Sequence, residues 1–152
     1  MRGFWLFVHF SGFVMWLGGG MASMIAGVSA KRFPPAERLA VYRAVAAVHS
    51  ILIRSGAIAV VVSGIFLVLG MGGFGNLPPY INMMMANGIL GAIVLGGFSV
   101  PTAIKLGALE LDARGELPES FARLRKRQAV VATIAGLFGI LALFGGTIIR
   151  AR

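Results

Sequence analysis

The chain has 152 residues, of which 58 % are hydrophobic and only 12 % are charged, and its formal net charge is +9. A soluble domain carries about 25 % charged residues, so this composition cannot cover a water-exposed surface and favours a single membrane domain over residues 1–152. The sequence contains no cysteine, which excludes disulfides, thiolate metal sites and covalent c-type haem. Its basic residues flank apolar stretches, which favours contact with anionic lipid headgroups and argues against nucleic acid as a partner.

Four apolar stretches are long enough to cross a bilayer, which takes about 20 residues. They cover residues 4–28, 47–70, 81–106 and 129–149. The first is longer than the hydrophobic part of a signal peptide, so we expect it to persist as a membrane helix. The sequence therefore predicts an all-α fold, a bundle of four transmembrane helices in contact with the lipid bilayer.

The three connections differ sharply in charge. The first (residues 29–46) and the third (residues 105–128) hold ten of the 14 Lys and Arg residues, whereas the second (residues 71–80) holds none. The ten are Lys31, Arg32, Arg38, Arg43, Lys105, Arg114, Arg123, Arg125, Lys126 and Arg127. The positive-inside rule then predicts a multi-pass protein of the bacterial inner membrane with both termini on the periplasmic side.

Small residues recur every four positions on three of the apolar stretches. Lipid gives helices no hydrophobic reason to associate, so close backbone approach at small residues must hold a bundle together. We expect these stripes to pack within one copy, against a second copy, or against a partner membrane protein. They are Gly19, Ser23 and Gly27; Gly88, Ala92 and Gly96; and either Ala132 and Gly136 or Ala135 and Gly139.

Three ionisable residues lie inside the apolar stretches, where such groups are costly. Arg54 is predicted either to reach the headgroups or to pair with a carboxylate or propionate of a cofactor. His49 is predicted to lie at the inner membrane interface. His9 lies near the outer end of the first stretch, on the order of 20 Å from His49, so the two imidazoles are not expected to share a metal.

The outer end of the third stretch should lie at the depth of His9. It reads from Tyr80 through Asn82 and Met84 to Asn87. Histidine and methionine form an axial pair for haem and also suit copper(I), so His9, Met84 and Asn82 are candidate cofactor-binding residues, with haem b or copper as the cofactor. The alternative is that no cofactor binds, that the methionines fill gaps in the packing, and that His9 bonds to Asn82 or to a backbone carbonyl.

The first stretch contains His9, Gly12, Trp16 and Gly18 in the order His-x-x-Gly-x-x-x-Trp-x-Gly. This pattern resembles the first helix of small membrane proteins that include copper-resistance D proteins, oxygen-independent protoporphyrinogen oxidases and related uncharacterised four-helix proteins. Resemblance to the oxidases implies that His9 binds b-type haem. Their essential lysine near the start of the third helix has no match, because the first lysine there is Lys105, and the uncharacterised branch is therefore the expected relative.

These observations predict a haem- or metal-binding membrane protein with a redox or haem-related role, centred on His9. Gly12 is expected to leave a gap beside His9, with Trp16 as an aromatic wall. The main alternative is a non-catalytic accessory subunit that packs through its glycine-rich faces. A transporter is disfavoured by the lack of carboxylates in the apolar stretches, and a hydrolase by the lack of a His, acid and Ser set at one depth.

The predicted orientation can be tested by single cysteines, since the chain has none of its own. Gly75→Cys, in the uncharged connection, should react with a membrane-impermeant maleimide added to intact cells. Arg114→Cys should react only after the membrane is permeabilised. Labelling of Arg114→Cys from outside in intact cells would reverse the predicted orientation.

Overall fold

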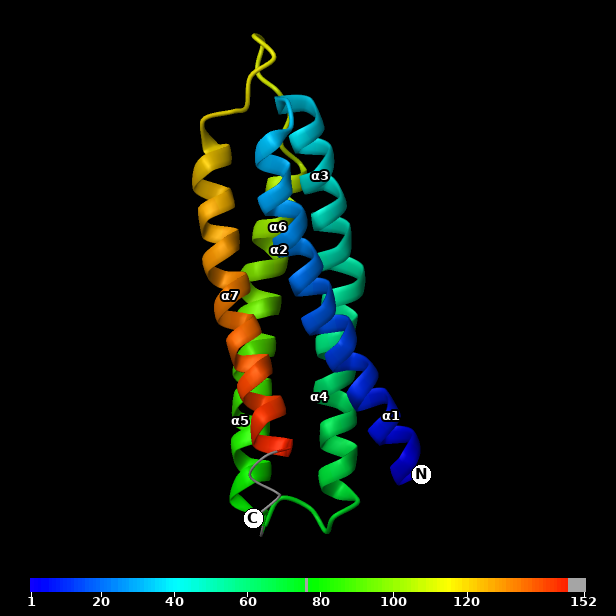
Figure 1. Ribbon diagram of the computed structural model, residues 1–152. Helices are drawn as coiled ribbons and strands as arrows, with labels where there is room; N and C mark the ends of the chain where they lie inside the picture. Colours follow the sequence, from blue (N-terminus) through cyan, green and yellow to red (C-terminus); the bar gives the residue numbers. More distant parts are fainter. Residues whose placement is uncertain (76, 148–152) are drawn as a thin grey trace.

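The computed structural model describes residues 1–75 and 77–147 and is, over these residues, an all-α bundle of four long helices (Figure 1). Each of the four is long and apolar enough to span a membrane. The predicted fold class is therefore confirmed, and the last part of the fourth predicted span, residues 148–149, lies outside the described residues.

The four membrane helices comprise several helical segments. The first contains α1 (Arg2–Phe13), the π-helical turn η1 (Val14–Gly18), α2 (Gly19–Ser29) and the 3-10 turn η2 (Ala30–Arg32). The second contains α3 (Pro35–Ala47), the π-helical turn η3 (Val48–Ile53) and α4 (Arg54–Leu69). The third contains α5 (Pro79–Val94), the π-helical turn η4 (Leu95–Ser99) and α6 (Val100–Gly107), and the fourth is α7 (Ser120–Thr147).

The helices extend well beyond the predicted apolar spans on the basic side of the bundle. Pro35 and Pro79 each stand at the first position of a helix, where proline's missing N–H costs nothing. The second helix therefore starts at Pro35, and most of the predicted first connection is helical. Likewise α7 starts at Ser120, so Gln128, assigned from the sequence to the third connection, lies inside a helix.

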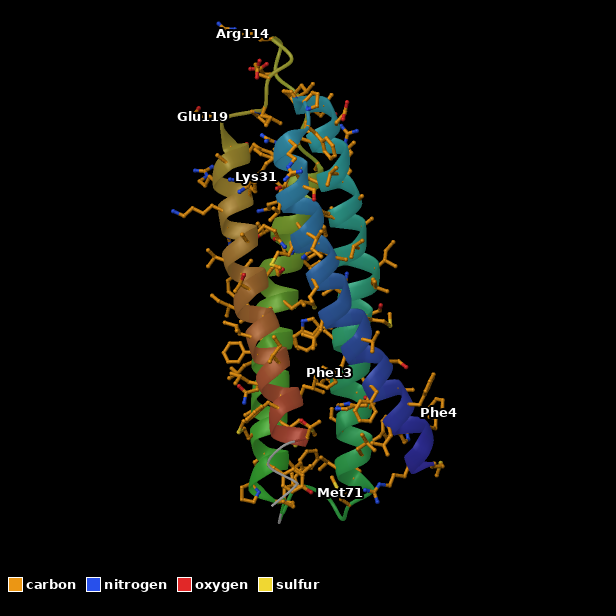
Figure 2. All side chains as sticks on the ribbon, in the orientation of Figure 1. Phe4, Phe13, Lys31, Met71, Arg114 and Glu119 are labelled. Carbon is orange, nitrogen blue, oxygen red and sulfur yellow. The ribbon has the colours of Figure 1, made fainter. Side chains whose placement is uncertain are left out.

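The bundle is built from two helix pairs. In one half of the molecule α1 packs along α4 and α5 packs along α7, while in the other half α3 packs along α6. Figure 1 shows the N-terminus, the end of α7 and the α4–α5 connection at one end, with the α6–α7 connection at the other. Lys31, Arg114 and Glu119 gather at that second end, and Phe4 and Met71 lie at the first (Figure 2).

The first pair is joined where two glycines meet. A Cβ atom at Gly12 would lie 2.7 Å from the carbonyl oxygen of Gly56, and a Cβ at Gly56 would lie 2.7 Å from the carbonyl oxygen of Gly12. The backbones of α1 and α4 therefore touch directly. The expectation that Gly12 leaves a gap beside His9 is wrong, because the backbone and side chain of α4 fill that space.

Trp16 joins the two pairs. Its side chain is 2 % exposed, and a Cβ at Gly91 of α5 would lie 2.7 Å from the indole. On α7, a Cβ at Gly139 would lie 3.6 Å from the same ring. The indole thus occupies the space left by two glycines on two helices. The aromatic ring beside His9 is instead Phe13, whose centroid lies 5.2 Å from the imidazole in an edge-on arrangement.

The predicted small-residue stripes divide into used and unused positions. Gly19 packs on Ile53, and the carbonyl of Gly27 accepts a hydrogen bond from the Tyr42 hydroxyl at 3.4 Å, so the first stripe packs inside the bundle as expected. On the third helix, a Cβ at Gly88 or Gly96 would meet nothing within 4 Å. In this second stripe only Ala92 packs against the core, while Gly88 borders the cavity at His9.

The contact between Gly12 and Gly56 gives a stability prediction. Gly12→Ala should force α1 away from α4 and lower the free energy of unfolding by about 1–3 kcal/mol, the usual cost of overpacking. The measurement is thermal unfolding in detergent. Gly18→Ala is the matched control, because its Cβ would meet nothing within 4 Å, and it should leave stability unchanged or raise it by up to about 1 kcal/mol. Equal effects of the two changes would contradict the proposed contact.

Candidate functional site

His9 is buried in α1 and bonded to the neighbouring helix α4. Its side chain is 7 % exposed, and its Nδ1 lies 2.9 Å from Oγ of Ser63, a residue with no exposed surface. A Cβ at Gly64 would lie 3.4 Å from Cε1 of the imidazole, so the absence of a side chain there gives the ring its room. Ser63 and Gly64 together form the surface of the second membrane helix that His9 contacts.

The hydrogen bonds of Ser63 favour one tautomer of His9. The Ser63 hydroxyl has one proton and lies within reach of the carbonyls of Ala59 and Val60 on the preceding turn. When it donates to one of these carbonyls, its oxygen accepts the Nδ1–H of His9. In this tautomer, Nε2 carries the free lone pair. This is the arrangement of a metal-binding histidine, whose other nitrogen donates to a fixed partner.

Nε2 of His9 has no hydrogen-bond partner among the described residues, although it is buried. An unsatisfied polar group in an apolar environment costs about 1–3 kcal/mol by mutational measurements. The imidazole also lines a cavity. An occupant of that cavity is the candidate partner for Nε2.

The cavity has a volume of about 70 Å³ and lies between α1, α4 and α5. It is lined by His9, Phe13, Val60, Val61, Gly64, Ile65, Met84, Met85, Gly88 and Ile89. One water needs about 10–15 Å³, whereas pockets for organic ligands measure about 300–1,000 Å³. A single ion or a few waters fit this space. A porphyrin does not fit unless α4 and α5 move apart.

The structure brings together two of the four predicted site residues. His9 and Met84 line the same cavity, and Met85 joins them. Asn82 is exposed, and its Nδ2 donates to the carbonyl of Leu77 at 3.3 Å, so it is not a partner of His9. Arg54 is also exposed at the start of α4, away from the cavity-lining residues of that helix.

Met84 can supply a thioether only after a side-chain rotation. A Cβ at Gly146 of α7 would lie 2.7 Å from its Sδ, so the sulfur points to the fourth helix while the rest of the side chain lines the cavity. Methionine is unbranched and flexible, which makes this rotation inexpensive. Within residues 1–75 and 77–147 no three His, Cys, Asp or Glu side chains gather into a metal site. Any ion at His9 would therefore depend on sulfur or water for its other ligands.

A second buried polar network lies in the other half of the bundle. His49, in η3, is 2 % exposed; its Nδ1 donates to the carbonyl of Val45 at 3.0 Å and lies 3.5 Å from Oγ of Ser23. Gln128 of α7 donates from Nε2 to Nε2 of His49 at 2.9 Å and to Oγ of Ser99 at 3.1 Å. The network includes one residue from each membrane helix and satisfies both nitrogens of His49.

This network corrects one expectation and confirms another. The prediction that His49 lies at the membrane interface is wrong, because the side chain is enclosed between helices. His9 and His49 belong to separate networks, as predicted. At about 1.5 Å of rise per residue, His49 lies about 20 Å along the second helix from Ser63, the partner of His9.

Two functional candidates, Ser63 and Gln128, were missed in the sequence prediction, whereas Met85 is one of the methionines at the outer end of the third stretch that the prediction included. Ser63 is a polar residue next to a glycine inside an apolar helix, in the sequence Val62-Ser63-Gly64. Small residues of this kind indicate a contact between membrane helices. Gln128 stands next to three basic residues and looked like part of a solvated connection. Only the pairing of α7 with the other helices reveals its burial.

No protein-family model matches this sequence, and no curated protein and no solved structure matches it significantly. The resemblance to copper-resistance D proteins and protoporphyrinogen oxidases therefore remains a prediction that rests on short sequence patterns in the first two membrane helices.

Gln128→Ala should weaken the bundle, since it removes two hydrogen bonds between helices. Such bonds contribute on average about 0.6 kcal/mol and at most about 1.7 kcal/mol each in membrane proteins. We expect a loss of about 1–3 kcal/mol in unfolding free energy, and a coupling of about 0.6–1.7 kcal/mol between Gln128→Ala and His49→Ala in a double-mutant cycle. Val130→Ala, on the lipid-facing side of the same helix, is the control. Additive effects of the two changes would show that the contact contributes nothing.

Proposed function

We propose that this chain is a multi-pass protein of the bacterial inner membrane that binds a metal ion, best copper(I), in the cavity between α1, α4 and α5. The observation that supports this proposal is the buried Nε2 of His9, which has no partner among the described residues, while Nδ1 is held by Ser63. A nitrogen lone pair held in this way is suited to bind an electrophilic ion.

The donors near His9 favour a soft ion. Met84 and Met85 line the same cavity, and thioethers together with imidazole suit copper(I) better than the hard ions magnesium and calcium, which prefer oxygen. The cavity volume of about 70 Å³ matches an ion with few ligands. Haem remains the alternative that the first-helix pattern implies, and it requires a wider separation of the two helix pairs than the structure has.

The accessory-subunit hypothesis has separate support. A Cβ at Gly18, Gly20, Gly96 or Gly97 would meet nothing within 4 Å, so these helical glycines are not needed for packing in one copy. They leave flat faces on the first and third helices that suit close contact with another membrane helix. A role as a non-catalytic subunit follows if the purified protein binds neither copper nor haem.

Copper(I) binding can be measured anaerobically by competition with a coloured chelator, using purified protein in detergent. Wild type should bind one ion. His9→Ala should abolish this binding, and Ser63→Ala should weaken it about 10–100-fold, because loss of the partner that orients a ligand typically has that effect. Met84→Ala should weaken it as well. Met21→Ala, at an exposed position of α2, is the control for removal of a methionine and should have no effect.

The haem hypothesis is tested on the same variants. A Soret band after reconstitution of wild type, absent from His9→Ala, would assign haem iron to this site in place of copper. If wild type bound neither ligand, or if binding were unchanged in His9→Ala, the metal proposal would be wrong and the accessory subunit would be the better hypothesis.

A further inference from the structure

A groove of about 540 Å³ opens at the end of the bundle opposite the N-terminus. Its lining comes from the turn between the first two helices and from the start of α7. The lining residues are Lys31, Arg38, Leu117, Pro118, Glu119, Phe121, Ala122 and Arg125. The volume lies within the range of about 300–1,000 Å³ that is typical of small-molecule sites.

Three cations from three different elements converge on this groove. Lys31 belongs to η2, Arg38 to α3 and Arg125 to α7, so their convergence depends on the fold and not on a run of basic residues in the sequence. Glu119, at the rim, is the single carboxylate in the lining. The groove therefore carries a net positive charge and suits an anion.

Arg38 is held in place at the groove. Its Nε donates to the carbonyl of Ala30 at 3.0 Å and its Nη2 to the carbonyl of Lys31 at 2.7 Å, which caps the end of the first membrane helix. Its guanidinium carbon lies 6.0 Å from the ring centre of Phe121. These two bonds use two of the five N–H donors of the guanidinium, which leaves up to three for a ligand.

The other side of the groove is apolar. Phe121 is buried and packs edge-on against Tyr42, with ring centres 5.3 Å apart, and Leu117, Pro118 and Ala122 extend this wall. A simple inorganic anion would gain nothing from such a wall. A molecule with a phosphate at one end and hydrocarbon at the other would use both sides.

We propose that this groove binds the headgroup of an anionic phospholipid, with the phosphate among Lys31, Arg38 and Arg125 and the glycerol and first acyl carbons against Leu117 and Ala122. Lys31 and Arg125 lie three and four residues beyond the predicted apolar spans 4–28 and 129–149, about 5–6 Å at 1.5 Å of rise per residue, which is the depth of the lipid headgroups. Basic pockets between membrane helices are a recognised form of lipid binding site. The site is separate from the cavity at His9, and this proposal does not depend on metal binding.

The test is lipid binding to the delipidated full chain in detergent, measured by native mass spectrometry with phosphatidylglycerol and with zwitterionic phosphatidylcholine. Wild type should bind one phosphatidylglycerol in clear preference to phosphatidylcholine. Arg125→Gln and Lys31→Gln should each weaken that binding about fivefold, the effect expected of one basic residue at an anionic surface. Lys126→Gln is the matched control, since it removes the same charge from the next residue of α7 without touching the groove.

Three results would overturn the proposal. An equal loss in Lys126→Gln and Arg125→Gln would show diffuse attraction to the basic surface. Unchanged binding in both Arg125→Gln and Lys31→Gln would show that the groove is not the site. Displacement of the lipid by millimolar inorganic phosphate would assign the groove to free phosphate. Thermal unfolding of each variant shows whether a loss of binding comes from a loss of fold, and Lys31→Gln, at an exposed position, is the variant least able to affect folding.

Discussion

The arrangement of this bundle depends on the indole of Trp16 and the two glycines that accommodate it. Helices in lipid gain no hydrophobic energy from each other, so contacts between neighbouring pairs need close packing. Trp16 reaches from the first helix into the space above Gly91 and Gly139. A side chain at Gly91 would displace the ring, whereas a Cβ at Gly139 would touch the ring at 3.6 Å and crowd Leu17 at 2.9 Å. On one side of Trp16 the helix pairs are bridged by hydrogen bonds. On the other side they leave the cavity beside His9.

The two histidines differ in their hydrogen bonds, and each lies in a different half of the bundle. His49 has a backbone carbonyl for one nitrogen and Gln128 for the other, so its imidazole is fully satisfied and cross-links helices. His9 has only Ser63, and its second nitrogen is left without a partner in the described residues. Both Trp16 and His49 lie in π-helical turns, and Ser99 ends a third. Such turns insert an extra residue into a helix and often occur at functional positions.

Much of the fold could be predicted from the sequence, because span length, charge partition and small-residue spacing are local properties. The joint location of His9 and Met84 was also within reach, since helical rise fixes the depth of a residue. What could not be predicted was rotation, that is, which face of each helix turns inward. Asn82 lies at the right depth but faces outward, and Gln128 follows a basic run but faces the centre. The three π-helical turns shift the register of the faces in a way that a regular helical wheel does not represent.

Because helix rotation could not be predicted, the sequence also did not show which residues surround His9. A histidine in a membrane helix most simply completes its hydrogen bonds with a neighbour, as His49 does. At His9 the neighbouring residues that the structure describes leave Nε2 without a hydrogen bond. Ser63 contacts only Nδ1, Gly64 has no side chain, and Phe13 presents hydrocarbon. A protein gains no stability from such an arrangement, and local choices that cost stability are typical of functional sites. The unsatisfied nitrogen is therefore the feature of this bundle on which the proposed metal site rests.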